Sequence, residues 1–131
     1  MPIHLTIDHG KRFVHARAEG VITLKDIEDV SDTVVAQDAL TYAKLFDATE
    51  ADGTYNDDDV MTLAARATAY AALGERGPLA LVPRKGGPGE LARRYVNLGR
   101  FAGQARIFAT ANEARAWLDS LATDQAAGTK A

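Results

Sequence analysis

The chain has 131 residues, of which 47% are hydrophobic and 25% charged, an ordinary composition for one soluble domain that can bury a core. A formal net charge of −3 leaves no face-wide basic excess, so we expect no general nucleic-acid binding. Cysteine is absent, which excludes disulfides, a thiol nucleophile and cysteine–zinc sites. The start lacks the apolar core of a signal peptide and no apolar run could span a bilayer, so we expect a cytoplasmic protein without stable membrane insertion.

A β-hairpin is predicted at the beginning of the chain. Apolar and polar residues alternate over residues 3–8, which is the pattern of a half-buried strand. His9-Gly10 is a tight-turn signal, because glycine tolerates positive φ, and a second strand follows over about residues 12–19. A two-residue turn would pair Leu5 with Val14, which puts the apolar residues of both strands on one face.

Helices and strands alternate over the rest of the chain. Thr23 is a good N-cap with Asp26 in the capping-box position, so a helix is expected from there. Three more strands are predicted, namely Tyr42–Asp47, Leu79–Val82 and Arg106–Phe108. A polar loop over residues 48–55 follows the first of them. Three more helices are predicted, namely from the Asn56–Asp59 caps to about Leu73, from Pro88 or Gly89 to Phe101, and along the stripe Ala114, Trp117, Leu118 and Leu121.

The order of elements indicates an α/β domain. Strands separated by helices need crossover connections, which are right-handed, so most of the sheet should be parallel. We expect one domain over residues 1–123, with a five-stranded sheet and four helices, and a small, polar tail over residues 124–131 that frays.

Several local sequences occur together in an order that resembles one family. They are Gly20-Val21-Ile22-Thr23 with Asp26, Leu45-Phe46-Asp47, Leu79-Ala80-Leu81-Val82, Leu91-Ala92-Arg93, and Ile107-Phe108 with Glu113-Ala114 and Trp117-Leu118. In order and spacing the chain resembles the SpoIIAA-like branch of the STAS superfamily, small bacterial domains related to anti-sigma-factor antagonists, with a more distant likeness to CRAL-TRIO lipid-binding domains. The resemblance implies a β-α superhelix whose helices lie mainly on one face of the sheet.

The same resemblance implies a regulatory role through phosphorylation, which this sequence supports only in part. In true antagonists a serine within an Asp-Ser pair follows the third strand and is phosphorylated. The matching region, residues 47–56, contains no serine, and Thr49, Thr54 and Tyr55 are its hydroxyl groups. Thr49 and Thr54 are therefore the candidates for phosphorylation.

A basic, glycine-rich loop is the leading candidate for a ligand site. Lys85, Gly86, Gly87 and Gly89 lie between a predicted strand and the start of a helix that carries Arg93 and Arg94. Backbone N–H groups at a helix start together with arginine donors would hold a phosphate or a carboxylate. The alternative is a mobile surface loop with both arginines in solvent.

A second candidate is the sheet face that points away from the helices. The predicted register and alternation place aromatic and histidine side chains there, an unusual surface for a pure monomer: His4, Phe13, His15, Tyr42, Phe46 and Phe108, with Thr6, Arg17, Lys44 and Arg106 beside them. This face could be a homodimer interface, a ligand floor or a surface that the last helix covers. His4 opposite His15 would suggest a metal pair, but two ligands without a carboxylate favour an interaction surface instead.

Asp47 is the remaining single-residue candidate, because it ends a central strand where α/β ligand sites form. Its alternative is a carboxylate that accepts hydrogen bonds from the N–H groups after it. The aspartates at 57–59 are explained by helix capping. No catalytic triad can be composed, since all three histidines lie in the first hairpin and Ser31 and Ser120 lie on predicted helices.

These observations leave several functions open. The first is a non-enzymatic regulatory or protein-interaction module without a cofactor, which acts as a monomer or homodimer and binds a protein partner or a small anionic or amphipathic ligand. The second is a carrier or sensor for a lipid-like or apolar molecule, held beneath the helices or on the aromatic sheet face. A phospho-switched antagonist and an undetected enzyme are further alternatives.

Overall fold

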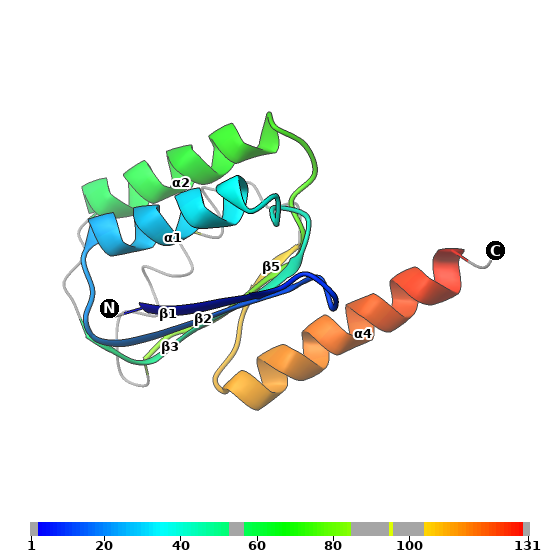
Figure 1. Ribbon diagram of the computed structural model, residues 1–131. Coiled ribbons are helices and arrows are strands. Elements are labelled where there is room, and N and C mark those ends of the chain that lie inside the picture. The colour runs from blue at the N-terminus through cyan, green and yellow to red at the C-terminus, as the bar shows by residue number, and fades with distance from the viewer. Residues whose placement is uncertain (1–2, 53–56, 85–94, 96–103, 130–131) are drawn as a thin grey trace.

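The structure is an α/β sandwich with one sheet between helices (Figure 1). This computed structural model describes residues 3–52, 57–84, 95 and 104–129, with side chains for all of these except 57 and 123–129. The strands are β1 (Ile3–Asp8), β2 (Phe13–Val21), β3 (Ala43–Asp52), β4 (Leu79–Val82) and β5 (Ala105–Ile107). The described helices are α1 (Leu24–Ala36), α2 (Asp57–Ala71) and α4 (Ala111–Thr129).

The five strands lie side by side in chain order, β1-β2-β3-β4-β5. The pair β1–β2 is antiparallel and the other three pairs are parallel, so the predicted α/β class with a mostly parallel five-stranded sheet is confirmed. Because every right-handed crossover steps in the same direction, the connecting helices fall on one face, and α1 and α2 lie together there (Figure 1). The helix α4 lies on the opposite face, so the described helices divide between both faces.

The hairpin has a longer loop than the sequence suggested. Asp8 pairs with Phe13 and Leu5 pairs with Ala16, so the predicted pairing of Leu5 with Val14 is wrong by two positions. Asp8 Oδ1 accepts a hydrogen bond from the Lys11 backbone N–H at 2.9 Å, which extends the turn to four residues. A shift of two positions keeps the side chains on the same face, so the predicted facing of both strands survives.

The strand β3 continues well beyond its predicted end. It pairs with β2 as far as Val21 and Asp52, across a register shift between Arg17 and Glu19, so the first five residues of the predicted 48–55 loop are strand. The end of β3 therefore lies far from Asp47, which the sequence had placed at the carboxyl edge of the sheet.

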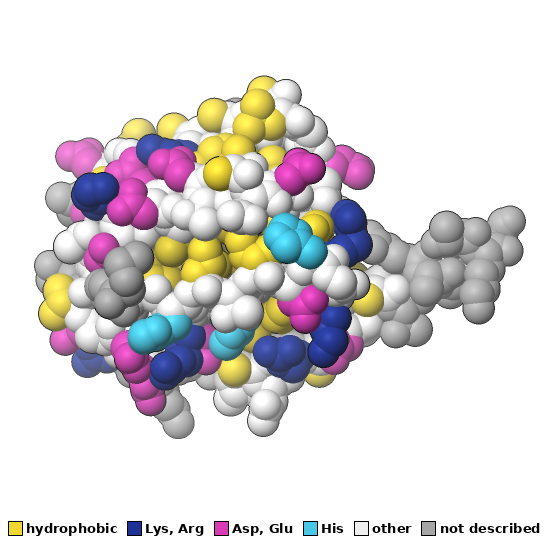
Figure 2. Space-filling view, in the orientation of Figure 1, with side chains coloured by type: hydrophobic (Ala, Val, Ile, Leu, Met, Phe, Trp, Pro, Cys, Tyr) yellow, Lys and Arg dark blue, Asp and Glu magenta, His cyan; other side chains and the backbone are white. Residues whose placement is uncertain are grey.

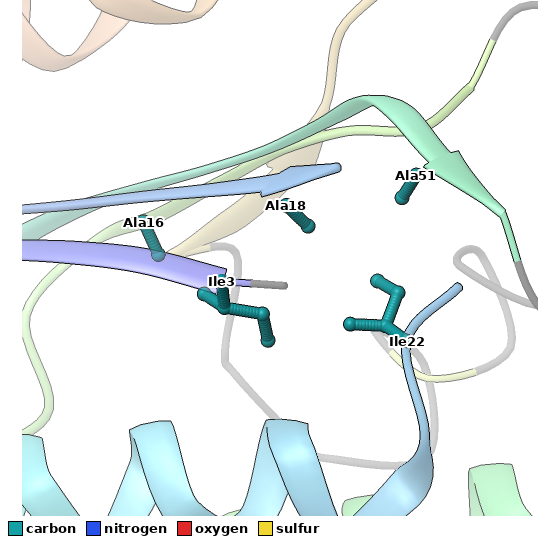
Figure 3. Packing of buried hydrophobic residues seen from close by; sticks show 5 residues of the cluster. All are labelled: Ile3, Ala16, Ala18, Ile22 and Ala51. Carbon is teal, nitrogen blue, oxygen red and sulfur yellow. The ribbon is translucent and has the colours of Figure 1, made fainter. Parts of the chain in front are cut away.

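Two layers of core pack against the sheet. On the α1–α2 side, five residues form the cluster that Figure 3 draws, with Ile27 and Val30 of α1 packed on it: Ile3, Ala16, Ala18, Ile22 and Ala51. On the α4 side, Leu45, Ala80 and Val82 contact Ala114 and Leu118, as the predicted stripe on the last helix implies. The first layer is rich in alanine, whose short side chains reach little of the way to the helices above.

The helix boundaries follow ordinary capping chemistry. Thr23 Oγ1 accepts a hydrogen bond from the Asp26 backbone N–H at 3.2 Å, and Asp26 Oδ2 accepts one from the Thr23 N–H at 2.9 Å. The predicted capping box is thus confirmed. Within the described ranges, none of the helices combines the length and hydropathy that crossing a membrane requires. The predicted domain boundary at residue 123 stays a prediction.

Candidate functional site

A cavity of about 280 Å³ lies between the sheet and the helices α1 and α2. It follows the face of the sheet on which the alanine-rich core lies, and apolar side chains make up most of its wall. The strands contribute Val14, Ala16, Phe46, Ala48 and Leu81, and the helices contribute Ile27, Val30, Val34, Val60, Leu63 and Ala67. Figure 2 shows hydrophobic side chains at the surface along the seam between α1 and the sheet beneath it.

Small side chains explain why this space is open. Ala16, Ala48 and Ala67 line the cavity, and each leaves unfilled the volume that a leucine or phenylalanine would occupy in a close-packed interior. An apolar space of this size is at the lower end of the range for small-molecule sites, which are commonly concave and mostly hydrophobic with few polar groups.

The polar groups of the cavity gather at its ends. Lys44 of β3 lines one end, and its Nζ donates hydrogen bonds to the carbonyl oxygens of Leu40 at 2.5 Å and Tyr42 at 2.8 Å. Burial lowers the pKa of Lys44 to about 8, because the charged amine loses water, and the positive charge of Arg76 lowers it further. The cavity therefore has a cationic end with an amine that titrates close to neutral pH.

Gly77 shapes the wall beside Lys44. Its backbone N–H donates to the Leu40 carbonyl at 2.9 Å, and the Lys44 N–H donates to the Pro78 carbonyl at 2.8 Å. A Cβ placed on Gly77 would lie 2.2 Å from the Tyr42 oxygen and 2.3 Å from the Thr41 oxygen, closer than real contacts allow. Only glycine fits here, and the close approach sets the backbone whose carbonyls hold Lys44.

Arg76, Tyr70 and Tyr95 complete the cationic end. Arg76 Nη1 donates to the Ala67 carbonyl of α2 at 2.9 Å, which holds the guanidinium against the wall. Burial raises the pKa of Tyr95 to about 12, partly offset by the charge of Arg76, so its phenol stays neutral. Two tyrosine and two cationic side chains thus line this part of the cavity.

The opposite end of the cavity carries an ion pair. Arg84 Nη1 lies 2.8 Å from Asp52 Oδ1, and both side chains are largely exposed. Asp52 is eight residues beyond Lys44 on the same strand, which at about 3.3 Å per residue separates the two ends by roughly 25 Å. The cavity lining is therefore long and narrow, with charge at both ends and apolar side chains between them.

Two helices form the roof and are joined by a polar cluster. Arg66 of α2 contacts Glu28 at 2.8 Å and Asp32 at 2.5 Å, both on α1, and its guanidinium also donates to Tyr70 Oη at 3.1 Å. Tyr70 in turn donates to Asp32 at 3.2 Å. This cluster joins α1 to α2 near the surface, in addition to the packing of Ile27 and Val30 of α1 on the sheet.

The structure shows which of the residues predicted for the second sheet face lie there, while an interaction through that face stays a prediction. Phe13 and His15 share the face that α4 approaches, where the Arg115 guanidinium lies 4.9 Å from the Phe13 ring centre, and Phe108 lies 5.5 Å from the Trp117 ring. Burial lowers the pKa of His15, and the charge of Arg115 adds to the effect. The last helix therefore covers part of this surface, as one predicted alternative had it.

Three residues assigned to that face lie elsewhere. Lys44 and Phe46 line the cavity on the α1–α2 side, and Tyr42 is buried with Val14 and Val34 of the same side. The prediction failed because β3 is covered on both faces, so apolar and polar residues do not alternate clearly along it. The sequence therefore did not decide which alternate residues face α1 and α2 and which face α4.

The predicted placement of His4 opposite His15 is also wrong. Thr6, not His4, lies opposite His15, and His4 Nε2 is 2.9 Å from Glu19 Oε1 instead. In the part of the chain that the structure describes, no three metal-ligating side chains gather in one place.

Asp47 accepts a hydrogen bond from an N–H group that follows it, which is the alternative that the sequence analysis gave to a ligand-binding role. Its Oδ1 accepts hydrogen bonds from the Thr49 N–H at 3.0 Å and from Thr49 Oγ1 at 2.7 Å, all within β3. The remaining candidates lie outside the described residues, namely Lys85, Gly86, Gly87, Gly89, Arg93, Arg94 and Thr54, together with the helix predicted to end at Phe101.

Comparison with known proteins leaves the family open, because no family model and no curated protein matches the chain. The fold and the site define an α/β domain with a mainly apolar cavity that has a cationic end. The sequence had placed Lys44 on the sheet face that points away from the helices. Two sequence signals could have indicated the cationic end of the cavity. They are a lysine within a predicted strand and the pair Gly77-Pro78.

Proposed function

We propose that this protein is a non-enzymatic module that binds one small, largely apolar molecule in the cavity beneath α1 and α2. The observation that carries the proposal is the open, mainly apolar space of about 280 Å³ between the sheet and the helices α1 and α2. Apolar side chains favour the transfer of a hydrophobic ligand from water by about 25 cal/mol for each Å² that is buried. A carrier or a sensor is the role that such a space serves.

Binding without chemistry agrees with how the polar groups of the cavity are used. Lys44 and Arg76 hold backbone carbonyl oxygens, and Asp52 and Arg84 hold each other. These contacts position side chains around a ligand. They do not form the nucleophile and base pair that covalent catalysis requires.

The proposal includes a SpoIIAA-like, STAS-like regulatory role in which the occupied domain contacts a protein partner or a second copy of itself. The sequential strand order and the helices α1 and α2 on one face support it, since a β-α superhelix winds in this way. A phospho-switch at Thr49 is less well supported, because this residue lies within β3 and its hydroxyl is bonded to Asp47.

Native mass spectrometry of the protein purified from its own cells tests the proposal. A stoichiometric small molecule that is lost on delipidation, and regained on adding back the extract, would support the carrier role. The variant Ala48→Phe fills the middle of the cavity and should come without that molecule, whereas Ala116→Phe on the exposed side of α4 should retain it. Bare protein in every preparation, with no uptake from extract, would refute the proposal.

A further inference from the structure

The charge of the cavity is distributed unevenly, and this indicates what kind of ligand it takes. Lys44 and Arg76 line the same end, where burial lowers the pKa of Lys44 most and the positive charge of Arg76 lowers it further. The lysine ammonium has three N–H donors. Two of them reach the Leu40 and Tyr42 carbonyls, which leaves the third N–H without a partner in the described part of the chain.

The other titratable groups that line the cavity, among the described residues, are two tyrosines, one carboxylate and Arg84. Tyr70 of α2 and Tyr95 lie at the cationic end, and burial raises the pKa of Tyr95 to about 12, so its phenol is neutral. The carboxylate of Asp52 lies at the other end of β3, paired with Arg84 and roughly 25 Å from Lys44. Among the described residues that line the cavity, the carboxylate of Asp52 therefore lies at the end away from Lys44 and Arg76.

The dimensions of the cavity set the size of the ligand. A water molecule occupies about 30 Å³ in the liquid, so a space of about 280 Å³ holds roughly nine groups of that size. The lining follows the length of β3, which suits an unbranched chain better than a compact ring system. An aliphatic chain of eight to ten carbons fits within these limits.

We propose that the cavity binds an unbranched aliphatic carboxylate of about eight to ten carbons, with its carboxylate against Lys44 Nζ and the Arg76 guanidinium and its chain along β3. The inference rests on the proposed function and names the ligand class of the same site. Charge-assisted hydrogen bonds from an ammonium and a guanidinium to a carboxylate are among the stronger polar contacts in proteins.

Proton linkage gives this ligand a recognisable signature. A bound carboxylate favours the charged form of Lys44, so binding raises the pKa of the lysine above its value of about 8 in the free protein. Affinity is then constant below pH 8 and falls as the pH rises above it, because the free protein must take up a proton on binding. The carboxylate of the ligand stays ionised throughout this range.

Isothermal titration calorimetry with three matched probes tests the inference: octanoate, octan-1-ol and octylammonium at pH 7. Octanoate should bind about 10- to 100-fold more tightly than octan-1-ol, and octylammonium should bind most weakly. Between pH 7 and pH 9.5 the affinity for octanoate should fall about tenfold while that for octan-1-ol stays constant. Because these measurements use the unmodified protein, they do not depend on a variant that folds.

A lysine variant gives a second, independent readout. Lys44→Met should weaken octanoate about 10- to 100-fold and leave octan-1-ol within about threefold, whereas Lys25→Met, at an exposed site on α1, should change neither. Equal affinity for octanoate and octan-1-ol, or tightest binding of octylammonium, would overturn the carboxylate assignment and leave the proposed function standing. Failure of all three probes to bind would overturn both.

Discussion

Gly77→Ala is expected to be the most damaging small change in this chain. An added Cβ would meet the Tyr42 oxygen at 2.2 Å, the Thr41 oxygen at 2.3 Å and the Thr41 carbonyl carbon at 2.7 Å. All three are backbone atoms, which no rotamer change can move aside. The backbone must shift by about 1 Å to restore an ordinary contact, and overpacking of this kind costs about 1–3 kcal/mol or more.

The shift also lengthens the hydrogen bond from the Gly77 N–H to the Leu40 carbonyl, now 2.9 Å, which adds about 1 kcal/mol. The entropy that alanine removes from the unfolded chain recovers about 0.4–1 kcal/mol. The free energy of unfolding should therefore fall by about 2–3 kcal/mol. With a urea slope of about 2 kcal/mol per molar, the denaturation midpoint should fall by about 1–1.5 M.

Urea unfolding followed by circular dichroism measures this change, with Gly10→Ala as the matched control. A Cβ at Gly10 would meet the Asp8 carboxylate oxygen at 3.4 Å, an ordinary contact with a side chain that can move, so its midpoint should stay within about 0.3 M of the parent. Equal midpoints for the two variants would refute the close approach at Gly77 and the wall that it builds beside Lys44.

Three further predictions concern the core, the first helix and the buried lysine. Leu45→Ala, at a side chain that is 1% exposed, should lower the unfolding free energy by about 2–5 kcal/mol, whereas Leu73→Ala, at 67% exposure, should change it by less than about 0.5 kcal/mol; urea unfolding of both checks this. Thr23→Ala removes the N-cap of α1 and should cost about 0.5–2 kcal/mol, which a Thr23→Ser control should largely restore in the same assay. Folding lowers the pKa of Lys44 from 10.5 to about 8, so the unfolded chain binds more protons between these values and stability should rise from pH 8 to about pH 10. Above pH 10 stability should fall, because folding raises the pKa of Tyr95 to about 12 and the folded state keeps that proton longer. A Lys44→Met variant whose urea midpoint shows the same rise would contradict the assignment.

Much of the fold was within reach of the sequence, because local signals decided it. The capping box at Thr23 and Asp26 depends on residues three apart, and the strand Leu79–Val82 is a short apolar run between a Gly-Pro break and a basic loop. The hairpin was found, but its register was two positions out, because the hydrogen bond from the Lys11 N–H to Asp8 lengthens the turn.

The site was out of reach because it depends on contacts between distant segments. Lys44 lies in a strand that is covered on both faces. The hydrophobic pattern of that strand allows the Lys44 side chain to point to either face of the sheet. The cavity arises only when Ala16 and Ala48 of the sheet meet Ala67 of α2, and no local pattern states that pairing. The sequence also suggested a small anionic or amphipathic ligand and placed its cationic groups in the loop that begins at Lys85, which lies outside the described residues.

The most direct test of the central claim is a titration with octanoate observed by NMR of a sample labelled at Ile, Leu and Val methyl groups. We predict that the methyl signals of Val30, Val34 and Leu81, which line the cavity, shift and saturate together, while those of Val82 and Leu118 on the α4 side stay unchanged. Shifts confined to the α4 side of the sheet, or no saturable shift of any methyl group, would contradict it.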